Sequence, residues 1–405
     1  MFVRRSRQAA QTVWRWGNGG GSSESTKSPS IISSLKKIEE EVSSISNGVD
    51  HSALVVGGKI LTFGGNKYSQ LGRPTAAEWD SNPSVIGSGA TSVVCGGWHS
   101  VSLHEDGSVR SFGWGGSIFS GAGGLGLGSK SAAAELRDIF INERIVQVAC
   151  GQQHTLFLSE SGTVYAAGHG AYGILGTGDT SDELFPVELT SLKETLFEGE
   201  KVTKVACGGS FSALITDGGN LYVWGRNDSG QLGLGEESQG DMHSAERYPR
   251  RIPFFESERV QIRDVACGEN HMVAVAANGA IYYWGDRTWL EPHVVSLPEA
   301  NGGLKSINKI VAGSKYSFAL SESGIVYAWG AKNSGCLILP DLKKGNTVVP
   351  TPIPPSIFGN EKVIDITAGR QRCTAVTTDE EYVVTSEEEA ERIRDHVNKE
   401  STHSK

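Results

Sequence analysis

The stretch VTKVACGGSFSALITDGGNLYVWGRNDSGQLG, residues 202–233, is one complete copy of a pattern that recurs along the chain. Short apolar runs flank a central glycine, a turn pair follows, and the copy ends in Gly-Gln-Leu-Gly. Periods of about 45–60 residues are typical of propellers and other stacked repeats, in which each unit buries its apolar face against a neighbour. The central glycines of the seven copies are Gly48, Gly96, Gly151, Gly208, Gly268, Gly313 and Gly369.

Each copy predicts four short strands. An outer segment follows a proline, as in residues 186–189, and precedes a Val-x-x-Val-Ala-Cys run, a run after the central glycine and a Val-Tyr-x-Trp-Gly run. Asp217-Gly218 stands where a tight hairpin requires a positive φ. Seven such units arranged radially predict an all-β fold, a seven-bladed β-propeller over residues 29–385. The seventh copy is the weakest, because Glu381–Val384 lacks the Trp-Gly ending.

These residues resemble the regulator of chromosome condensation repeat, whose pattern is V-A-C-G-x-x-H/F-S, then D-G, then V-Y-x-W-G-x-N-x-x-G-Q-L-G. Residues 224–233 lie close to this pattern, and residues 63–72 repeat it with Ser69 in place of a glycine. The resemblance spans residues 29–385. It implies a seven-bladed propeller whose repeats are offset from its blades, so that the two chain ends close one blade.

The resemblance implies a range of functions, because one fold hosts many. The founding member exchanges nucleotide on the small GTPase Ran. Relatives include a plant UV-B photoreceptor, domains of large ubiquitin ligases, and organelle proteins of ribosome assembly or RNA processing. A photoreceptor of this family would present a dense cluster of Trp and Arg in its Gly-x-x-His loops, where this chain has only Trp98.

Residues 1–28 predict a mitochondrial transit peptide followed by a linker. Arg4, Arg5, Arg7 and Arg15 precede the first acidic residue, and apolar residues lie between them. Such an Arg-rich, acid-free, amphipathic start is typical of organelle targeting, with a disordered basic tail as the alternative. We therefore expect a mitochondrial protein, in the matrix or at the inner-membrane face, with a nuclear or cytoplasmic location as the alternative.

The charged residues 386–405 follow the last repeat. Ala390, Ile393 and Val397 fall on one helical face. This spacing predicts a short helix packed on the outer rim, with an interaction helix as the alternative.

Composition limits the classes of partner and site. The formal net charge is −9, which argues against a nucleic-acid surface built from general positive potential. No apolar stretch approaches the roughly 20 residues that a membrane-spanning helix needs. Cys95, Cys150, Cys207 and Cys267 occupy one repeat slot that alanine also fills. A packing role is therefore favoured over a metal site, and no metal is expected.

No catalytic constellation occurs in the sequence, which favours a non-enzymatic protein without a cofactor. There is no G-x-x-x-x-G-K-S/T phosphate loop, no G-x-S-x-G elbow and no H-E-x-x-H pair. Histidines follow the central glycine at His51, His99, His154 and His271. Because Phe211 fills the same slot in another copy, these histidines are predicted to pack between blades.

Binding residues are expected on loops that depart from the repeat, since a rigid scaffold presents them. Aromatic and arginine side chains there are the types that anchor interfaces, and the acidic residues of the loop at 176–183 are candidate contacts for a GTPase. The candidate residues are Ile118, Phe119, Asp179, Asp182, Glu183, Tyr248, Arg250, Arg251, Phe254, Phe255 and Trp289. For Phe254, Phe255 and Trp289 the alternative is that they cover blade edges.

The leading functional hypothesis is a non-enzymatic propeller that serves as a binding platform in mitochondrial ribosome assembly or RNA processing. Its partners would be proteins, such as mitochondrial ribosomal proteins, with RNA as an indirect partner. One alternative is a guanine-nucleotide exchange factor, which requires a rigid surface that stabilises the nucleotide-free form of a small GTPase. A second alternative is an assembly factor for respiratory complexes.

Overall fold

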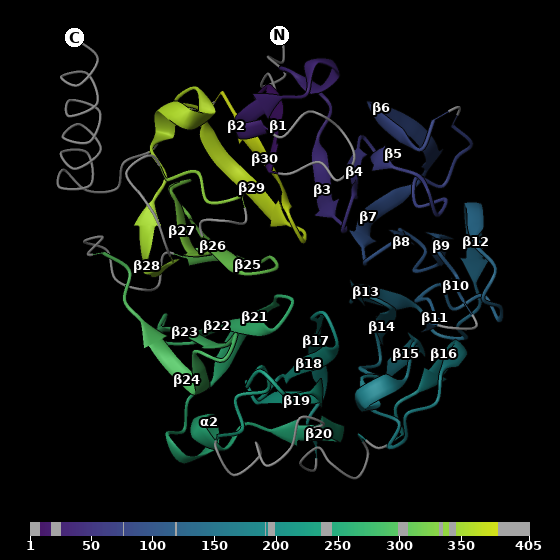
Figure 1. The fold of residues 1–405 in the computed structure, drawn as a ribbon, viewed down its shortest axis with the longest axis vertical. Coiled ribbons are helices and arrows are strands. Elements are labelled where there is room, and N and C mark those ends of the chain that lie inside the picture. The colour runs from purple at the N-terminus through teal and green to yellow at the C-terminus, as the bar shows by residue number, and fades with distance from the viewer. Residues whose placement is uncertain are drawn as a thin grey trace, which may run out of the picture.

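The protein is an all-β, seven-bladed β-propeller, as the repeats predict. The computed structural model describes residues 9–17, 26–75, 77–117, 120–190, 192, 199–235, 245–298, 307–331, 335–339 and 346–379. These residues form seven four-stranded antiparallel sheets around a central axis (Figure 1). No helix among them is long and apolar enough to cross a bilayer.

The strands of each sheet run in order from the axis outward. The first sheet holds β3 (Val42–Asn47), β4 (His51–Val56), β5 (Lys59–Gly65) and β6 (Trp79–Ser88), and the second holds β7 (Ala90–Cys95), β8 (His99–His104), β9 (Val109–Gly113) and β12 (Ala133–Ile139). The third holds β13 (Ile145–Cys150), β14 (His154–Ser159), β15 (Val164–Gly168) and β16 (Glu183–Glu188), and the fourth holds β17 (Val202–Cys207), β18 (Phe211–Thr216), β19 (Leu221–Arg226) and β20 (Ala245–Arg251). The fifth holds β21 (Ile262–Cys267), β22 (His271–Ala276), β23 (Ile281–Gly285) and β24 (Trp289–Val295), and the sixth holds β25 (Ile307–Ala312), β26 (Tyr316–Ser321), β27 (Val326–Ala331) and β28 (Asn346–Pro352). The seventh holds β29 (Lys362–Ala368), β30 (Arg372–Thr378), β1 (Gln11–Gly17) and β2 (Thr26–Ile31).

The shorter elements lie in the connections. β10 (Gly116–Ser117) and β11 (Gly121–Ala122) form a hairpin between β9 and β12, and the helix α2 (Pro253–Ser257) joins β20 to β21. The 3-10 turns are η1 (Ser33–Leu35), η2 (Ala171–Gly173) and η6 (Pro355–Phe358).

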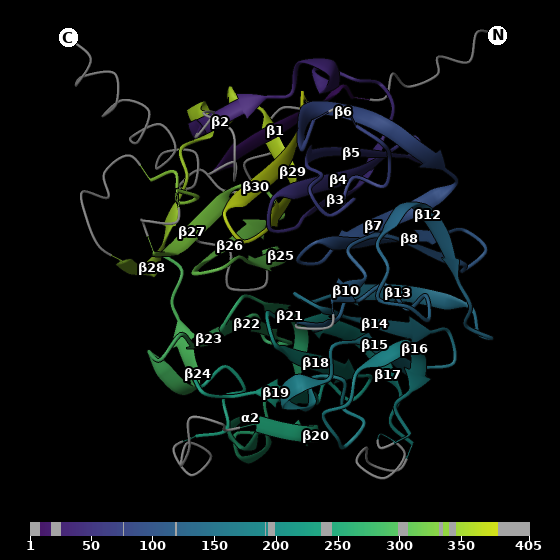
Figure 2. The same ribbon diagram turned by 45° about the vertical axis from the view of Figure 1, so that its right-hand side comes forward.

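The seventh sheet is built from both ends of the described chain. Its inner strands β29 and β30 come from the C-terminal part, and its outer strands β1 and β2 come from the N-terminal part. Figures 1 and 2 show the purple strands β1 and β2 beside the yellow strands β29 and β30. The offset between repeats and blades that the resemblance implies is thereby confirmed.

The predicted start of the propeller at residue 29 is wrong, because β1 lies inside the predicted leader and linker 1–28. β1 also takes the place in the closing sheet that the repeat pattern assigns to Glu381–Val384, and that segment, like the tail 386–405, lies outside the described residues. The run Val13–Gly17 reads VWRWG, a copy of the Val-Tyr-x-Trp-Gly pattern. This run was included in the predicted leader because it contains Arg15 and lies close to Met1.

Two tryptophans fix β1 in the core. Trp14 Nε1 donates a hydrogen bond to Thr377 Oγ1 at 2.9 Å, and Trp16 Nε1 donates to the Cys336 carbonyl at 2.8 Å. Both indole rings make edge-to-face contacts with Phe358, with centroids 5.8 Å apart in each pair. β1 therefore contributes buried aromatic area as well as backbone pairing.

Side chains in the slot three residues after the central glycine join neighbouring blades. His51 Nε2 lies 2.8 Å from Ser100 Oγ, and the same bond recurs from His99 to Thr155, from His154 to Ser212 and from His271 to Ser317 at 2.9 Å. All four rings are buried. Burial lowers the pKa of both His99 and His154 to about 3, so these rings are neutral at physiological pH. The predicted packing role of the histidines is confirmed.

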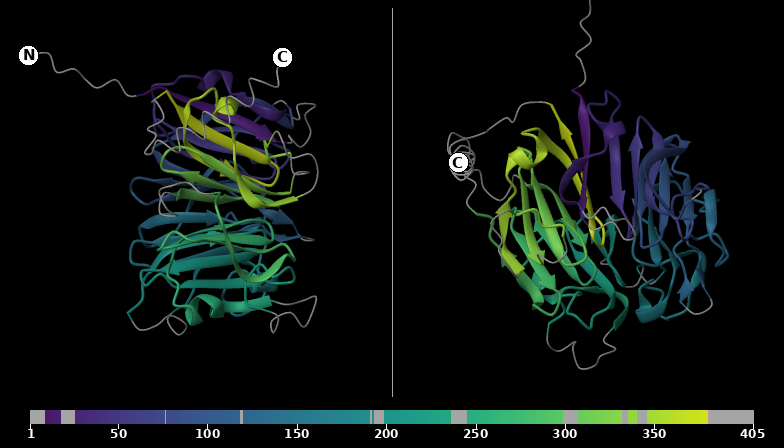
Figure 3. Two further views of the ribbon diagram at one scale, coloured as in Figure 1. Left: turned by 90° about the vertical axis from the view of Figure 1, so that its left-hand side faces the viewer. Right: turned by 45° about the horizontal axis from the view of Figure 1, so that its top comes forward.

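The antiparallel order places two sets of loops on one side of the propeller. The loop after each central glycine and the loop between the third and fourth strands start at the same end of a sheet, since Phe211 pairs with Gly225. We call this side the loop face. The tight turns between the second and third strands and the connections between sheets, α2 included, lie on the opposite face. Figure 3 shows the strands crossing from one face to the other when the molecule is viewed from the side.

Candidate functional site

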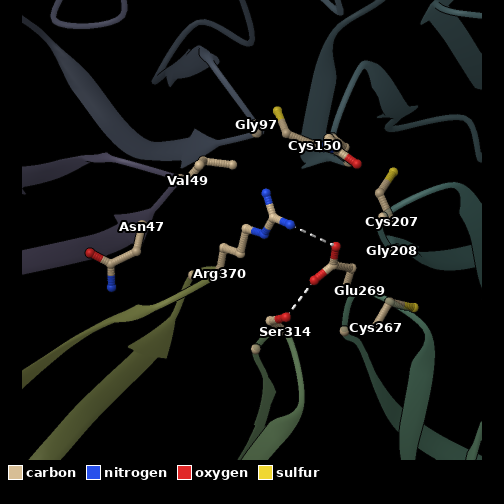
Figure 4. A pocket seen from close by; sticks show the side chains of 18 of the residues that line it. Asn47, Val49, Gly97, Cys150, Cys207, Gly208, Cys267, Glu269, Ser314 and Arg370 are labelled. Carbon is tan, nitrogen blue, oxygen red and sulfur yellow. Dashed lines mark hydrogen bonds and ion pairs between the residues drawn. The ribbon is translucent and has the colours of Figure 1, made fainter. Parts of the chain in front are cut away.

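A small cavity of about 130 Å³ lies on the propeller axis at the loop face, lined by residues around the seven central glycines. The Arg370 guanidinium reaches toward Glu269, with Nη2 3.5 Å from Oε1, and the Ser314 hydroxyl donates a hydrogen bond to the same carboxylate (Figure 4). These three residues come from the seventh, fifth and sixth sheets. One carboxylate therefore links three blades at the axis.

Three of the four thiols beside this cavity are packing groups. Burial raises the pKa of Cys150, Cys207 and Cys267 above the ordinary value, so they stay protonated. The Cys207 thiol donates to the Ala149 carbonyl of the preceding blade at 3.4 Å. Within the described part of the chain, no three His, Cys, Asp or Glu side chains are grouped to hold a metal ion. Burial would raise the pKa of the fourth lining thiol, Cys95, but the neighbouring His51 lowers it, and Cys95 and Asp50 in turn raise the pKa of His51 to about 9 against the effect of its burial. The described groups around the cavity are suited to binding.

Three aromatic side chains, Tyr68, Trp98 and Trp114, form a continuous row on the loop face. The ring centroids of Tyr68 and Trp98 lie 6.0 Å apart, those of Trp98 and Trp114 lie 5.9 Å apart, and both pairs meet edge to face. Tyr68 is 38% exposed, and the two tryptophans are half-buried. We call these residues the aromatic row. Trp98 follows Gly97, which lines the axial cavity, so the row begins at the cavity edge.

Asp182 fastens the β10–β11 hairpin to the next blade. Its Oδ2 accepts hydrogen bonds from the Ala122 N–H at 2.8 Å and from Lys130 Nζ at 3.0 Å. Its Oδ1 accepts from His169 Nδ1 at 2.8 Å and from the Gly170 N–H at 3.1 Å. The carboxylate therefore holds the hairpin of one blade against the loop of its neighbour.

Asp182→Asn is expected to lower the free energy of unfolding at neutral pH by about 1.5 kcal/mol, because it removes the charge from four hydrogen bonds. Burial alone would raise the pKa of Asp182, but the bonds from Lys130, His169 and the backbone lower it from 3.8 to about 2. A folded-state pKa below the unfolded one stabilises the protein above about pH 4, and this contribution is lost as pH falls toward about 2. Urea unfolding at neutral and acidic pH measures both effects.

Asp179→Asn is the matched control, since Asp179 is exposed and bonds only within its own loop among the contacts described, to the Ser181 N–H. We expect the stability of wild type to fall more steeply between pH 4 and pH 2 than that of the Asp182→Asn variant. If the stability of wild type and that of the Asp182→Asn variant fell in parallel with pH, the role given to Asp182 would be contradicted.

The structure places the remaining predicted residues of the loop face in two regions. Asp179 and Glu183 lie in and just after the loop between β15 and β16, and Trp289, 39% exposed, begins β24. Ile118 and Phe119, between β10 and β11, lie outside the described residues. A binding role for all of these residues stays a prediction.

Three further candidates lie on the outer strand β20. Tyr248 is 55% exposed. Arg250 pairs with Glu246 at 2.8 Å, and Arg251 pairs with Glu256 at 3.2 Å. Both guanidinium groups thus have carboxylate partners within the chain, so this region is a surface of mixed charge.

The phenylalanines of α2 lie on the opposite face. Phe255 is 4% exposed and meets Tyr282 and Trp284 edge to face, with centroids 5.1 and 5.8 Å apart. Phe254 meets Tyr282 at 5.8 Å. These contacts support the alternative that the pair covers a blade edge. The candidate residues are therefore spread over both faces of the propeller.

Sequence reasoning missed Tyr68, Trp114 and the axial pair of Arg370 and Glu269. A comparison of each loop position across the copies would have shown Trp114, because Gly65 and Arg226 occupy the same place in other copies. The axial pair gives no such signal, since it depends on how the blades face one another.

Comparison with known proteins agrees with this architecture. A family model described as the RCC1-like domain matches residues 7–291 and 119–404. The ultraviolet-B receptor UVR8 of Arabidopsis thaliana is 33% identical over 254 residues, which cover 60% of this chain and 52% of that protein. Protein RCC2 of Mus musculus is 29% identical over 262 residues, 56% of this chain and 48% of that protein. The match thus spans about half the length of each of these relatives.

Solved structures show the same fold. Yeast RCC1 (Prp20), crystallised with Kap60 bound, superposes with a TM-score of 0.77 at 22% identity, over 96% of this chain and 92% of that one. Human WBSCR16 superposes with a TM-score of 0.73 at 22% identity, over 93% of this chain and all of that one.

The fold and the repeats define a propeller of the type that presents its loops around a shared axis. The family can be assigned from the residues that the family model matches, together with the seven four-stranded sheets and the closing sheet built from both ends of the described chain. The chain belongs to the RCC1-like domain family.

Proposed function

We propose that this chain is a non-enzymatic platform that binds a protein partner through its loop face. The observation that carries the proposal is the aromatic row, in which Tyr68, Trp98 and Trp114 touch one another and remain partly open to solvent. Tyrosine and tryptophan are enriched among the residues that dominate binding energy. The row stands beside the axial cavity and the β10–β11 hairpin, so a partner can contact three neighbouring features of one rigid surface.

The solved relatives support a binding role. Yeast RCC1 binds Kap60, and the binding of yeast Prp20p to Gsp1p and histones has been characterised. Those partners are properties of those proteins. For this chain, the common element is a rigid propeller whose loops are free to differ.

For the location of the platform we propose mitochondria, with ribosome assembly or RNA processing as its setting. The support is the sequence ahead of β1, where Arg4, Arg5 and Arg7 occur without an acidic residue. Arg15 has a structural role instead, since it lies 5.9 Å from the centroid of the Phe63 ring and donates to the Ser81 carbonyl. In this proposal a leader is cleaved N-terminal to Gln11, which leaves β1 intact.

Trp98→Ala is expected to weaken partner binding at least about thirtyfold, the loss that corresponds to an interface residue worth about 2 kcal/mol. The measurement is a native pull-down of the C-terminally tagged protein from purified mitochondria, with and without RNase, followed by titration of the recovered partner. We expect ribosomal or RNA-processing proteins with wild type and their loss with the variant. RNase sensitivity would show that RNA connects them.

Phe140→Ala is the control, because Phe140 is an aromatic residue 90% exposed on the opposite face. It should leave partner binding unchanged. Equal loss with both variants, or equal recovery with both, would contradict a loop-face platform. Absence of the protein from mitochondria would contradict the proposed location alone.

The second candidate function is guanine-nucleotide exchange on a small GTPase. The β10–β11 hairpin favours it, since Asp182 holds this element rigidly on the loop face and exchange requires a fixed surface that stabilises the nucleotide-free state. Recovery of a nucleotide-free GTPase irrespective of RNase, and faster release of its nucleotide on addition of the purified protein, would favour this function over assembly.

A further inference from the structure

One blade lacks the long loop that the others carry between their third and fourth strands. β23 and β24 are joined only by Asp286–Thr288, in a tight turn in which Asp286 and Arg287 have φ of 51° and 57°. The Thr288 N–H donates to the Gly285 carbonyl at 2.9 Å. Two consecutive positive φ values are those of a type I′ hairpin turn, so the chain passes directly from one strand to the next.

In other blades this loop covers the next blade through two fixed hydrogen bonds. Trp284 Nε1 donates to the Gln231 carbonyl at 3.0 Å, and the Gly235 N–H donates to the Leu290 carbonyl at 3.1 Å. Leu232 between them is fully buried. The segment 231–235, QLGLG, thus contacts the next blade through the carbonyl of its first residue and the N–H of its fifth residue.

One interface earlier the same pair of bonds occurs. Trp224 Nε1 donates to the Ile174 carbonyl at 2.9 Å, and the Gly178 N–H donates to the Arg247 carbonyl at 3.2 Å. The segment 174–178, ILGTG, has the same spacing as QLGLG. A five-residue turn with these two contacts is therefore a recurrent part of the blade interface.

At the next interface no described residue occupies the place of this turn. Trp329 is 1% exposed, and its Nε1 has no hydrogen-bond partner among the described residues. Because Gly330 pairs with Thr347 as Gly285 pairs with Trp289, Val348 corresponds to Leu290. Val348 is 60% exposed, whereas Leu290 is half-buried beside the segment 231–235.

A cavity of about 420 Å³ occupies this position. Trp329, Thr347, Val348 and Trp289 line it, so it contacts the residues that the missing turn would cover. The Trp289 ring is stacked on His293, with centroids 3.9 Å apart and planes 4° apart, and gives the cavity a flat aromatic wall. The cavity thus combines the indole N–H of Trp329, which has no partner among the described residues, with exposed apolar surface.

We propose that this cavity, the vacant-turn site, binds a five-residue turn of a partner protein, and this inference deepens the proposed platform function by naming the chemistry of one contact. The first carbonyl of the turn accepts the hydrogen bond from Trp329 Nε1, and its fifth N–H donates to the Val348 carbonyl. The partner supplies what the chain supplies for itself at the interfaces that contain Gln231 and Ile174.

The lining also specifies the second residue of the turn. Tyr283 lines the cavity and holds the register position of Val223 in the fourth sheet. Its ring is larger than the Val223 side chain beside Leu232, so it reduces the room for a leucine. We therefore expect glycine or alanine at the second position, and glycine at the third and fifth positions, as at Gly233 and Gly235.

The test uses the full chain labelled with ¹⁵N in its tryptophan side chains. The probe is a capped nonapeptide with the sequence of residues 227–235 in which Leu232 is replaced by glycine. We expect a saturable shift of the Trp329 indole N–H signal and slower exchange of this proton with solvent, while the Trp284 signal stays in place. Trp329→Phe assigns the signal, and Phe63 and Phe112 show that phenylalanine fits this repeat slot.

Two variants separate the predicted contacts. Trp329→Phe is expected to weaken peptide binding about tenfold, followed by the indole signal of Trp289, which also lines the cavity. N-methylation of the peptide nitrogen that corresponds to Gly235 should have the same effect, since each change removes one hydrogen bond. A chain in which residues 226–244 replace 286–288 fills the site internally and should not respond to the peptide. A folded graft that still responds would overturn the proposed mode.

Failure to saturate at millimolar peptide, or a Trp329 indole proton already protected from exchange in the free protein, would also overturn the inference. The second result would mean that the chain itself satisfies this donor. Because the peptide is added in trans, its failure leaves the Trp98→Ala result unaffected, so the two proposals can fail separately.

Discussion

Replacing Trp16 with alanine is expected to lower the free energy of unfolding by about 3–5 kcal/mol, the cost of removing a large aromatic side chain from a core. Trp16 is 2% exposed, and its ring meets Phe318 and Phe358 edge to face. Its Nε1 donates to the Cys336 carbonyl. The substitution therefore removes a contact between the sixth sheet and the closing sheet.

Chemical denaturation followed by circular dichroism measures this effect. Trp289→Ala is the control, since Trp289 is 39% exposed, and it should cost less than about 1 kcal/mol.

Deletion of residues 1–17 should prevent closure of the propeller altogether. Wild-type stability in that deletion would contradict the structural role of β1 and would restore the predicted boundary at residue 29.

Gly208→Ala is expected to cost about 2–3 kcal/mol, at the upper end of the range for overpacking. A Cβ at Gly208 would overlap the Phe211 ring. That ring is fully buried between blades, so it has no free space into which to move. The same conflict exists between Gly151 and His154 and between Gly313 and Tyr316, whereas a Cβ at Gly369 would overlap the Gly48 carbonyl of the next blade. These overlaps explain the glycine at the central position of these copies.

Gly218→Ala provides the matched control, because the positive φ predicted for the Asp217-Gly218 turn falls on Gly219 instead. A Cβ at Gly218 would have its nearest contacts, at 3.2 Å, with the flexible Asn220 and Glu200 side chains. We expect a change within about 0.5 kcal/mol. Thermal unfolding of the two variants beside wild type gives the comparison. Equal destabilisation would mean that the loss of glycine itself matters more than the overlap with Phe211.

The repeat period was sufficient to predict the blades, because each copy must bury its apolar face against the next one. It was also sufficient to predict the packing role of the four histidines that follow the central glycine, since Phe211 fills the slot that His154 occupies in another copy. The period did not predict the start of the propeller. Val13–Gly17 carries the strand pattern, but its partner β30 lies at the other end of the sequence, and short-range reasoning assigned the arginines to a leader.

The candidate site was predicted less well, since the repeat constrains the blades and leaves the loops free. Asp182 reads in the sequence as an exposed acid, yet the structure gives it four partners on two blades. Phe255 reads as an interface anchor, yet it packs on Tyr282. Trp329 looks like the other blade tryptophans in the sequence, and only the three-dimensional arrangement shows that its indole N–H has no partner within the described parts of the chain.

The position of β1 also sets a time constraint on biosynthesis. Trp14 leaves the ribosome before its partner Thr377, which follows 363 positions later. At about 5–20 residues per second, the nascent chain exposes an unpaired aromatic strand for roughly 20–70 s before that partner is made. A strand with unpaired backbone N–H and C=O groups can pair with another chain, which leads to aggregation. We therefore expect chaperones that shield β1 until Thr377 has been made to raise the yield of folded protein.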